Sequence, residues 1–126
     1  MAKFKLNDRI YSCPVELTLA AVGGKWKVLL LWNMRDGMRR YGELKRLIPG
    51  ITHKMLTQQL RELEDDGIIS RRVYEVVPPH VEYSLTERGK ELSPVLEMMS
   101  KWGLQFMAED DEAYQSAPCC GEKIMA

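Results

Sequence analysis

The apolar pattern of the chain changes its period at Gly67, and this change constrains the fold more than any other feature. Before it, Ile51, Leu56, Leu60 and Leu63 recur at helical spacing. After it, "IISRRVYEVV" is rich in β-branched and aromatic residues, and "HVEYSL" alternates apolar with polar residues. The pattern predicts a helix followed directly by a β-hairpin, with the adjacent prolines between the two segments forming its loop.

The ends of this helix are marked by residues with known preferences. Thr52 occupies the N-cap position, and Gly67 suits the C-terminal stop. Upstream, "YGELKRLI" predicts a short helix that ends at Pro49-Gly50. A short helix, a turn and a longer helix make a helix-turn-helix, and a hairpin placed directly after it is a wing. We therefore predict a winged helix-turn-helix.

The flanking segments predict further helices. Residues 14–34 predict two short apolar helices separated by "VGG", and Pro14 suits the first helical position. Asp36-Gly37 predicts a turn, followed by a short strand at "MRRY". Thr86 is expected to cap a last helix, in which Pro94 causes a kink or a restart. The expected fold class is mainly α with a β-hairpin wing.

The last helix carries an apolar stripe for which a body of this size has little cover. We expect a second copy of the chain to cover it in a two-fold dimer, made by the N- and C-terminal helices. The alternative is that the helix folds back on residues 14–34 of its own chain. The expected dimer contacts are Leu92, Val95, Leu96, Met99, Trp102 and Phe106, and Met107 continues the stripe.

The chain of 126 residues is long enough for one domain with a single core. We expect it to contain four segments: N-terminal dimerisation and packing helices in 1–35, the winged helix-turn-helix in 37–86, a C-terminal dimerisation helix in 87–108, and a mobile acidic, cysteine-containing tail in 109–126.

The charges are distributed unevenly although the net charge is zero. Residues 1–47 carry ten basic and four acidic side chains, whereas residues 91–126 carry two basic and seven acidic ones. A chain polarised in this way can present a basic surface while remaining neutral overall. Charge alone leaves open the alternative of an ordinary mixed surface.

The helix at 52–66 has a second, polar face. We call its five residues the recognition surface: His53, Lys54, Thr57, Gln58 and Arg61. A helix fits the major groove of DNA, and the second helix of a helix-turn-helix enters it. Gln58 can pair with adenine and Arg61 with guanine. A polar helix face is usually only solvated, but the wing and the preceding helix favour DNA here.

The acidic residues of this helix lie in its other half, from Glu62 onward, and we expect that half to be scaffold. Arg71 and Arg72 point to opposite faces of the hairpin, so we expect Arg72 to face DNA and Arg71 to pair with an acidic neighbour. The further expected DNA contacts are Arg39, Arg40, Tyr41, Lys45, Thr52, Arg72 and His80.

Several segments in the same order resemble the HxlR-type transcriptional regulators, a branch of the MarR-like winged-helix proteins. They are "CPVELTLAAVGGKWKVLLLW", "RRYGELKRLIPGITHKMLTQQLRELEDDGII", "PPHVEYSLTERGKEL" and "KWG". The resemblance covers residues 11 to about 103. It implies a homodimeric repressor or activator that binds double-stranded DNA at a pseudo-palindromic operator, with recognition helix 52–66 and wing 69–85.

The cysteines allow more than one interpretation. Cys13 precedes a helix start, where the helix dipole favours a thiolate, and the resemblance implies a thiol sensor in some members. The alternative is a small buried residue that fixes the helix entry. The adjacent pair Cys119-Cys120 has poor zinc spacing, so we expect incidental exposed thiols, with crosslinking to another chain as the alternative.

Other function classes have less support. The two histidines, His53 and His80, lie on the expected recognition helix and wing, and no nucleophile, phosphate loop or metal cluster accompanies them. We therefore expect no enzyme, cofactor or metal site. The chain lacks an apolar run of transmembrane length, so we expect a cytoplasmic protein without membrane contact. We expect a transcription factor, with or without an input from a small ligand, an oxidant or an electrophile. The alternative is a winged-helix module that binds protein rather than DNA.

Overall fold

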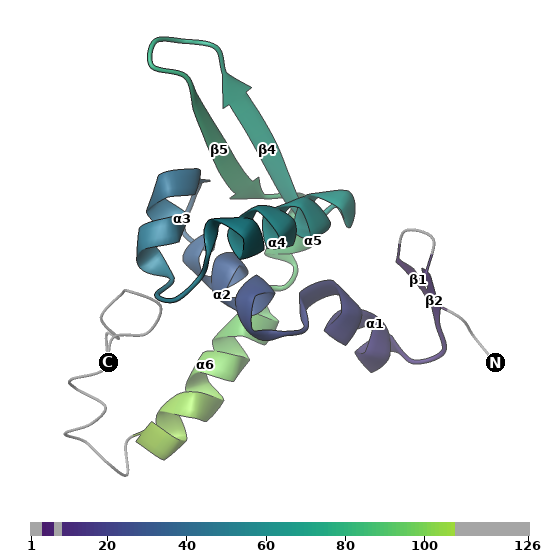
Figure 1. Ribbon diagram of the computed structural model, residues 1–126. Helices are drawn as coiled ribbons and strands as arrows, with labels where there is room; N and C mark the ends of the chain where they lie inside the picture. Colours follow the sequence, from purple (N-terminus) through teal and green to yellow (C-terminus); the bar gives the residue numbers. More distant parts are fainter. Residues whose placement is uncertain (1–3, 7–8, 108–126) are drawn as a thin grey trace.

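The structure, a computed structural model, describes residues 4–6 and 9–107 (Figure 1). The order of elements is β1 (Phe4–Leu6), β2 (Arg9–Tyr11), α1 (Pro14–Val22), α2 (Lys25–Asn33), β3 (Arg39–Arg40), α3 (Tyr41–Leu47), α4 (His53–Asp65), β4 (Ile69–Tyr74), β5 (His80–Leu85), α5 (Glu87–Lys90) and α6 (Ser93–Met107). The predicted fold class, mainly α with a β-hairpin wing, is confirmed.

The helix-turn-helix is formed by α3 and α4, and the predicted ends of α4 are present. The Thr52 hydroxyl accepts a hydrogen bond from the Met55 backbone N–H at 3.1 Å, which caps the helix. After the helix, Gly67 adopts a φ of +75°, a left-handed conformation that glycine allows. These two residues fix where the recognition helix starts and where the chain turns into the wing.

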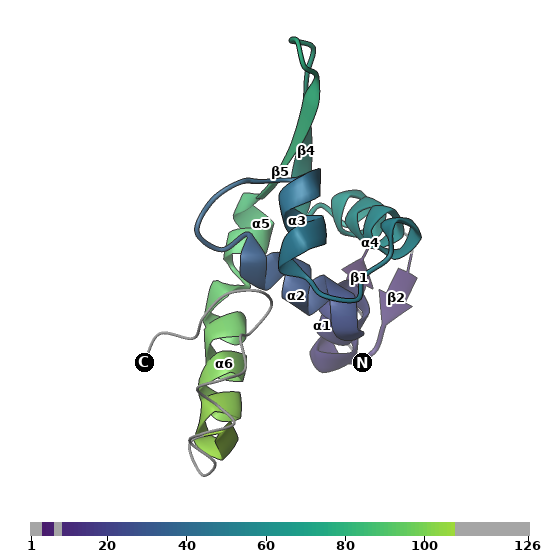
Figure 2. The same cartoon turned by 60° about the vertical axis from the view of Figure 1, so that its left-hand side comes forward.

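The wing is the hairpin of β4 and β5, which projects from the body (Figures 1 and 2). The short strand β3 pairs with β5, so the antiparallel sheet has the order β3-β5-β4. Its register places Arg40 and Arg72 on either side of Glu82, and Arg39 and Arg71 on either side of Tyr83. Because neighbouring strand residues alternate between faces, these two rows lie on opposite faces of the sheet.

The core is built mainly from the apolar faces of α2, α3 and α4 together with the base of the wing. Its innermost side chains are Leu30, Leu31, Met34, Leu44, Ile48, Ile51, Leu56, Leu60, Leu63, Ile68 and Ile69. The predicted stripe at Leu56, Leu60 and Leu63 thus holds α4 against the body. Because one face of α4 is buried in this way, its opposite face points to the solvent.

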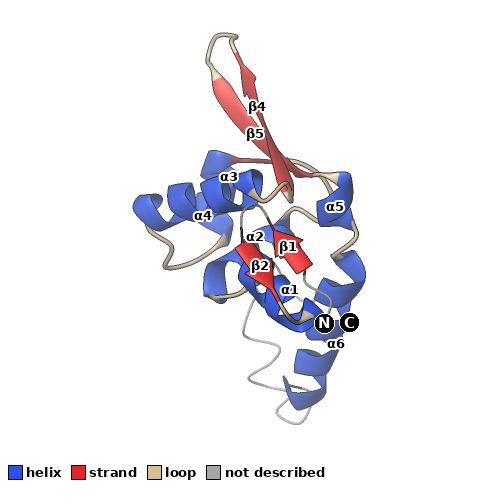
Figure 3. Cartoon of the chain, turned by 90° about the vertical axis from the view of Figure 1, so that its right-hand side faces the viewer, coloured by secondary structure: helices blue, strands red, loops and turns tan. Residues whose placement is uncertain are grey.

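The N-terminal strands β1 and β2 were not predicted. They form an antiparallel pair next to α1 (Figure 3). The Arg9 guanidinium of β2 donates to both carboxylate oxygens of Asp66, at 3.0 and 3.2 Å, and the Asp66 side chain is almost fully buried. This charge-assisted pair, in which Nη2 of Arg9 contacts both oxygens, ties the N-terminal strands to the end of the recognition helix.

The last predicted helix is two helices in the structure. Thr86 caps α5 as predicted, because its hydroxyl accepts from the Gly89 N–H at 3.1 Å. A β-carbon at Gly89 would lie 2.2 Å from the Ile68 carbonyl oxygen, so this close approach requires glycine. The restart expected near Pro94 is confirmed by α6, which begins at Ser93.

The helix α6 extends away from the body (Figures 1 and 2). Leu96 packs in the core of its own chain and Leu92 packs against it, whereas Val95, Met99, Trp102 and Phe106 are exposed. The alternative that the helix is covered by its own chain is therefore wrong for these four side chains, and the expected dimer contact is wrong for Leu96, which is buried within its own chain. The described part of the chain does not include the tail expected in 109–126, with Cys119 and Cys120. It also does not include the Met107 side chain. Within the described ranges, no helix has the length and apolar character needed to cross a membrane.

Candidate nucleic-acid interface

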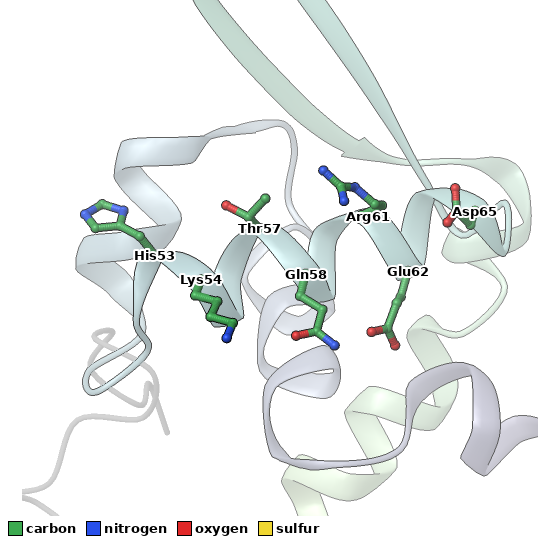
Figure 4. A pocket seen from close by; sticks show the side chains of 7 residues that line it. All are labelled: His53, Lys54, Thr57, Gln58, Arg61, Glu62 and Asp65. Carbon is green, nitrogen blue, oxygen red and sulfur yellow. The ribbon is translucent and has the colours of Figure 1, made fainter.

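All five residues of the recognition surface are exposed on the outer face of α4. Together with Glu62 and Asp65 they line an open hollow along the helix (Figure 4). The side chains form two rows of i, i+4 neighbours. Thr57 and Arg61 point to the same side as the hairpin, with His53 at the start of their row, whereas Lys54, Gln58 and Glu62 point the other way (Figure 4).

Tyr41, the first residue of α3, contacts the first of these rows. Its hydroxyl donates to the His53 backbone carbonyl at 3.2 Å and lies 3.1 Å from the Thr57 hydroxyl. It also lies 3.2 Å from Nδ1 of His53, and the two rings stack with their centroids 5.9 Å apart. Tyr41 therefore orders the start of the recognition surface from the neighbouring helix.

Lys27 of α2 contacts the second row. Its Nζ lies 2.8 Å from a carboxylate oxygen of Glu62, and its side chain is 8% exposed against 42% for Glu62. The hydrogen bond from Lys27 is the main reason why the pKa of Glu62 lies below its ordinary value; partial burial opposes the shift, and the charge of Lys27, the Gln58 amide and the charge of Arg9 add to it. Glu62 is therefore an ionised acceptor next to Gln58.

The position of Glu62 moves the expected boundary of the recognition surface. The helix from Glu62 onward was expected to be scaffold, but this carboxylate shares a row and a hollow with Lys54 and Gln58. Asp66 is scaffold as expected, since it is buried against Arg9. Glu62 therefore borders the recognition surface and is also paired with the body of the domain.

Polar and aromatic side chains of the wing contact one another. Nε2 of His80 lies 3.3 Å from a carboxylate oxygen of Glu82, and its ring stacks on Tyr74 at 4.7 Å. The Arg72 guanidinium lies 4.8 Å from the centre of the Tyr74 ring. In the register of β4 and β5, the acidic residue Glu82 lies opposite Arg72, and Tyr83 lies opposite Arg71. The expected acidic neighbour is therefore across from Arg72 and not from Arg71.

Among the remaining expected DNA contacts, some side chains are used within the domain and others are at least partly exposed. The Arg39 side chain donates to the Asn33 carbonyl at 2.8 Å and lies 3.7 Å from Glu43, so it serves the body of the domain. Thr52 is used as the helix cap. Arg40 is exposed, and Lys45 is half-buried in the last turn of α3.

Cys13 occupies the N-cap position of α1 and is an exposed free thiol. The alternative of a small buried residue at the helix entry is therefore wrong for this chain. Among the described residues, no group of three or more His, Cys, Asp or Glu side chains is arranged to hold a metal ion.

Sequence reasoning missed the two residues outside α4 that hold its side chains through charge, Arg9 and Lys27. A signal for the second was present, because Lys27 directly precedes the apolar run "VLLLW" in a segment that predicts an apolar helix. A charge embedded in a buried helix needs a partner. The sequence could not say which acidic residue would supply it.

Comparison with known proteins gives consistent matches over this region. A family model described as HxlR-like helix-turn-helix matches residues 21–111. The HTH-type transcriptional regulator YdeP of Bacillus subtilis, itself uncharacterized, is 52% identical over 106 residues, which are 84% of this chain and 83% of YdeP.

Two solved structures have the same fold. The redox regulator HypR in its oxidized form has a TM-score of 0.71 and 56% identity, covering 74% of this chain and 96% of that one. The reduced form of the transcriptional regulator YodB from B. subtilis has a TM-score of 0.65 and 38% identity, covering 75% of this chain and 93% of that one.

Proposed function

The chain belongs to the HxlR-like helix-turn-helix family and is a winged helix-turn-helix transcriptional regulator; from that premise we propose that it acts as a homodimer whose α4 helices contact base edges in the major groove of an operator. The exposed polar face of α4 carries this proposal. The geometry supports it because the same helix is held to the core by its opposite face, so the outer face is presented at a fixed angle.

The contacts divide into base-reading and backbone-binding side chains. Gln58 and Arg61 have the donor and acceptor sets that distinguish adenine and guanine, and we assign base contacts to them. Lys54 and Arg40 are exposed cations suited to phosphates. Arg72 on the wing is assigned to the backbone next to the recognition site. Arg39 and Thr52 are left out because their side chains are used within the domain.

The homodimer is proposed from an uncovered apolar face. On α6, Val95, Met99, Trp102 and Phe106 are exposed, and the rings of Trp102 and Phe106 lie 4.5 Å apart. Exposed apolar side chains also lie on α1, at Val15 and Leu19. Contiguous faces of this kind are typical of subunit interfaces, and a two-fold partner would place two α4 helices on one side of the assembly.

An oxidant input through Cys13 is the second part of the proposal. The thiol is exposed at the N-cap of α1, where an oxidant can reach it. The similarity to the redox regulator HypR supports this role. Cys13 also follows β2 by two residues, and β2 is tied to α4 through Arg9 and Asp66.

A mobility-shift titration tests the DNA-binding proposal. The wild-type protein, the Gln58→Ala variant and the Arg61→Ala variant would be titrated against duplexes selected from a random pool. We expect each variant to bind more weakly and with relaxed base preference. Unchanged affinity and preference in both variants would remove α4 as the reading element.

A further inference from the structure

The buried Lys27 side chain of α2 forms an ion pair with Glu62, a partly exposed residue of α4. Lys27 is nearly fully buried, and its Nζ reaches Glu62 of α4 at 2.8 Å. A buried ammonium strongly favours a partner anion, because removing that anion leaves an unpaired charge in a poorly solvated place. The Glu62 carboxylate is therefore held in one position along α4.

The fixed carboxylate lies one helical turn after Gln58. The amide nitrogen of Gln58 is turned toward the Glu62 carboxylate, and its oxygen is turned away (Figure 4). The Gln58 amide also contributes, as a hydrogen-bond donor, to the low pKa of Glu62. A carboxylate only accepts hydrogen bonds, so it selects the nitrogen side of a neighbouring carboxamide.

A glutamine that reads a base has two orientations of its amide, and they present opposite hydrogen-bond patterns. We propose that Lys27, which lies outside the helix-turn-helix motif, is a positioning residue for base specificity: it holds Glu62, and Glu62 holds the Gln58 amide with Nε2 on its own side and Oε1 toward the DNA. This inference rests on the proposed function, since it takes Gln58 to be a base contact.

The fixed orientation favours one base chemically. With one N–H of Nε2 directed at Glu62, the amide retains one N–H donor and one carbonyl acceptor. The major-groove edge of adenine offers the N7 acceptor and the N6 donor that match this pair. A freely rotating amide could satisfy other edges as well, so losing Lys27 should broaden the preference at this one base pair without removing phosphate contacts elsewhere.

The test compares dissociation constants for four duplexes that differ only at the base pair selected by Gln58. We expect Gln58→Ala to reduce the discrimination by about 5- to 150-fold, the range of a good bidentate contact. Lys27→Met, which keeps most of the apolar stem, should reduce it by about 5-fold or more at the same base pair and little at others. Adding Lys27→Met to Gln58→Ala should cause no further loss at that position.

Three further variants separate positioning from folding. Lys27→Arg keeps a cation and should keep the discrimination. Lys25→Met is the matched control, since Lys25 is exposed and lies over the Trp26 ring at 4.5 Å. If Lys27→Met is unfolded, the double variant Lys27→Met/Glu62→Ala replaces the pair without leaving a buried charge, and it should show the same broadened preference.

The outcomes distinguish this inference from the proposed function. A folded Lys27→Met or Lys27→Met/Glu62→Ala protein with wild-type discrimination overturns the positioning role alone, provided that Gln58→Ala does lose it. If Gln58→Ala keeps wild-type discrimination at every base pair, both the positioning role and the assignment of Gln58 as a base contact fall. Loss of discrimination in Lys27→Met at the Gln58 position only, with discrimination kept in Lys27→Arg, is the result that supports the inference.

Discussion

The hydroxyl oxygen of Tyr41 lies 3.1 Å from the hydroxyl oxygen of Thr57, which joins the first residue of α3 to the second turn of α4. The same Tyr41 hydroxyl donates to the carbonyl of His53. The two helices of the motif are thus connected by a polar contact at the end that is expected to approach DNA. This contact, the Lys27–Glu62 pair and the Arg9–Asp66 pair all hold α4 from outside.

Tyr41→Phe should weaken DNA binding more than it weakens the fold. The ring can still stack on His53, but the contacts to Thr57 and to the His53 carbonyl are lost, at a cost of about 0.5–1.5 kcal/mol in the free energy of unfolding. Urea unfolding and a mobility-shift titration would measure the two effects. A variant with wild-type affinity for the operator would show that Tyr41 does not order the recognition surface.

Arg61→Ala should cost about 1–3 kcal/mol in operator binding and relax the preference for one base pair, because a bidentate contact to guanine is removed. Arg88→Ala is the matched control, since it removes an exposed arginine on α5. Fluorescence anisotropy with the operator and with single-base variants would measure both. Equal losses in the two variants would point to a general effect of charge.

Glu62→Gln should destabilise the domain at neutral pH by about 1–3 kcal/mol, because the buried Lys27 loses its anion. The lowered pKa of Glu62 means that its contribution is present above its ordinary pKa of 4.5 and is lost as the pH falls below it. The difference between wild type and variant should therefore shrink on acidification. Urea unfolding at fixed protein concentration from pH 7 to pH 3.5 measures it; a difference that does not vary with pH contradicts the role of the pair.

Trp102→Glu should convert the dimer into a monomer, because it places a charge in the exposed apolar face of α6. Light scattering at micromolar concentration should give twice the chain mass for the wild type and the single chain mass for the variant. Met38→Glu, at another exposed apolar residue directly before β3, is the control and should remain a dimer. A wild-type protein that is monomeric under these conditions would rule out the proposed interface.

Cys13→Ser should make DNA binding insensitive to a mild oxidant, if the exposed thiol at the start of α1 is the sensor. The comparison is a mobility shift with and without hydrogen peroxide, followed by reduction with dithiothreitol. The Cys119→Ser/Cys120→Ser variant controls for the other thiols. An oxidant response that persists in Cys13→Ser would assign sensing to another residue.

The parts of the fold that could be predicted are those with a strong local signal. The apolar stripe of Leu56, Leu60 and Leu63, the cap at Thr52 and the stop at Gly67 define α4 without knowledge of the rest of the chain. The N-terminal pair β1 and β2 was missed, because two strands of three residues are too short for a period to appear. The Asn7-Asp8 dipeptide between them was the available turn signal.

The candidate site shows the same division. That the five residues of the recognition surface face outward follows from helical spacing, and the structure agrees. Which residues hold them depends on contacts between distant segments: Arg9 and Asp66 are 57 residues apart, and Lys27 meets Glu62 from another helix. Strand alternation alone places Arg39 and Arg40 on opposite faces, but only the pairing of β3 with β5 shows that Arg40 lies opposite Glu82 and Arg39 opposite Tyr83.

Selection of bound duplexes from a random DNA pool, run in parallel with the wild type and the Gln58→Ala variant, tests the central claim most directly. We expect one enriched, two-fold symmetric site whose half-sites are centred about 10 base pairs apart. We also expect the variant to lose preference at one symmetric pair of positions. A pool without an enriched site, or a variant that enriches the wild-type site unchanged, would contradict the claim that α4 reads the operator.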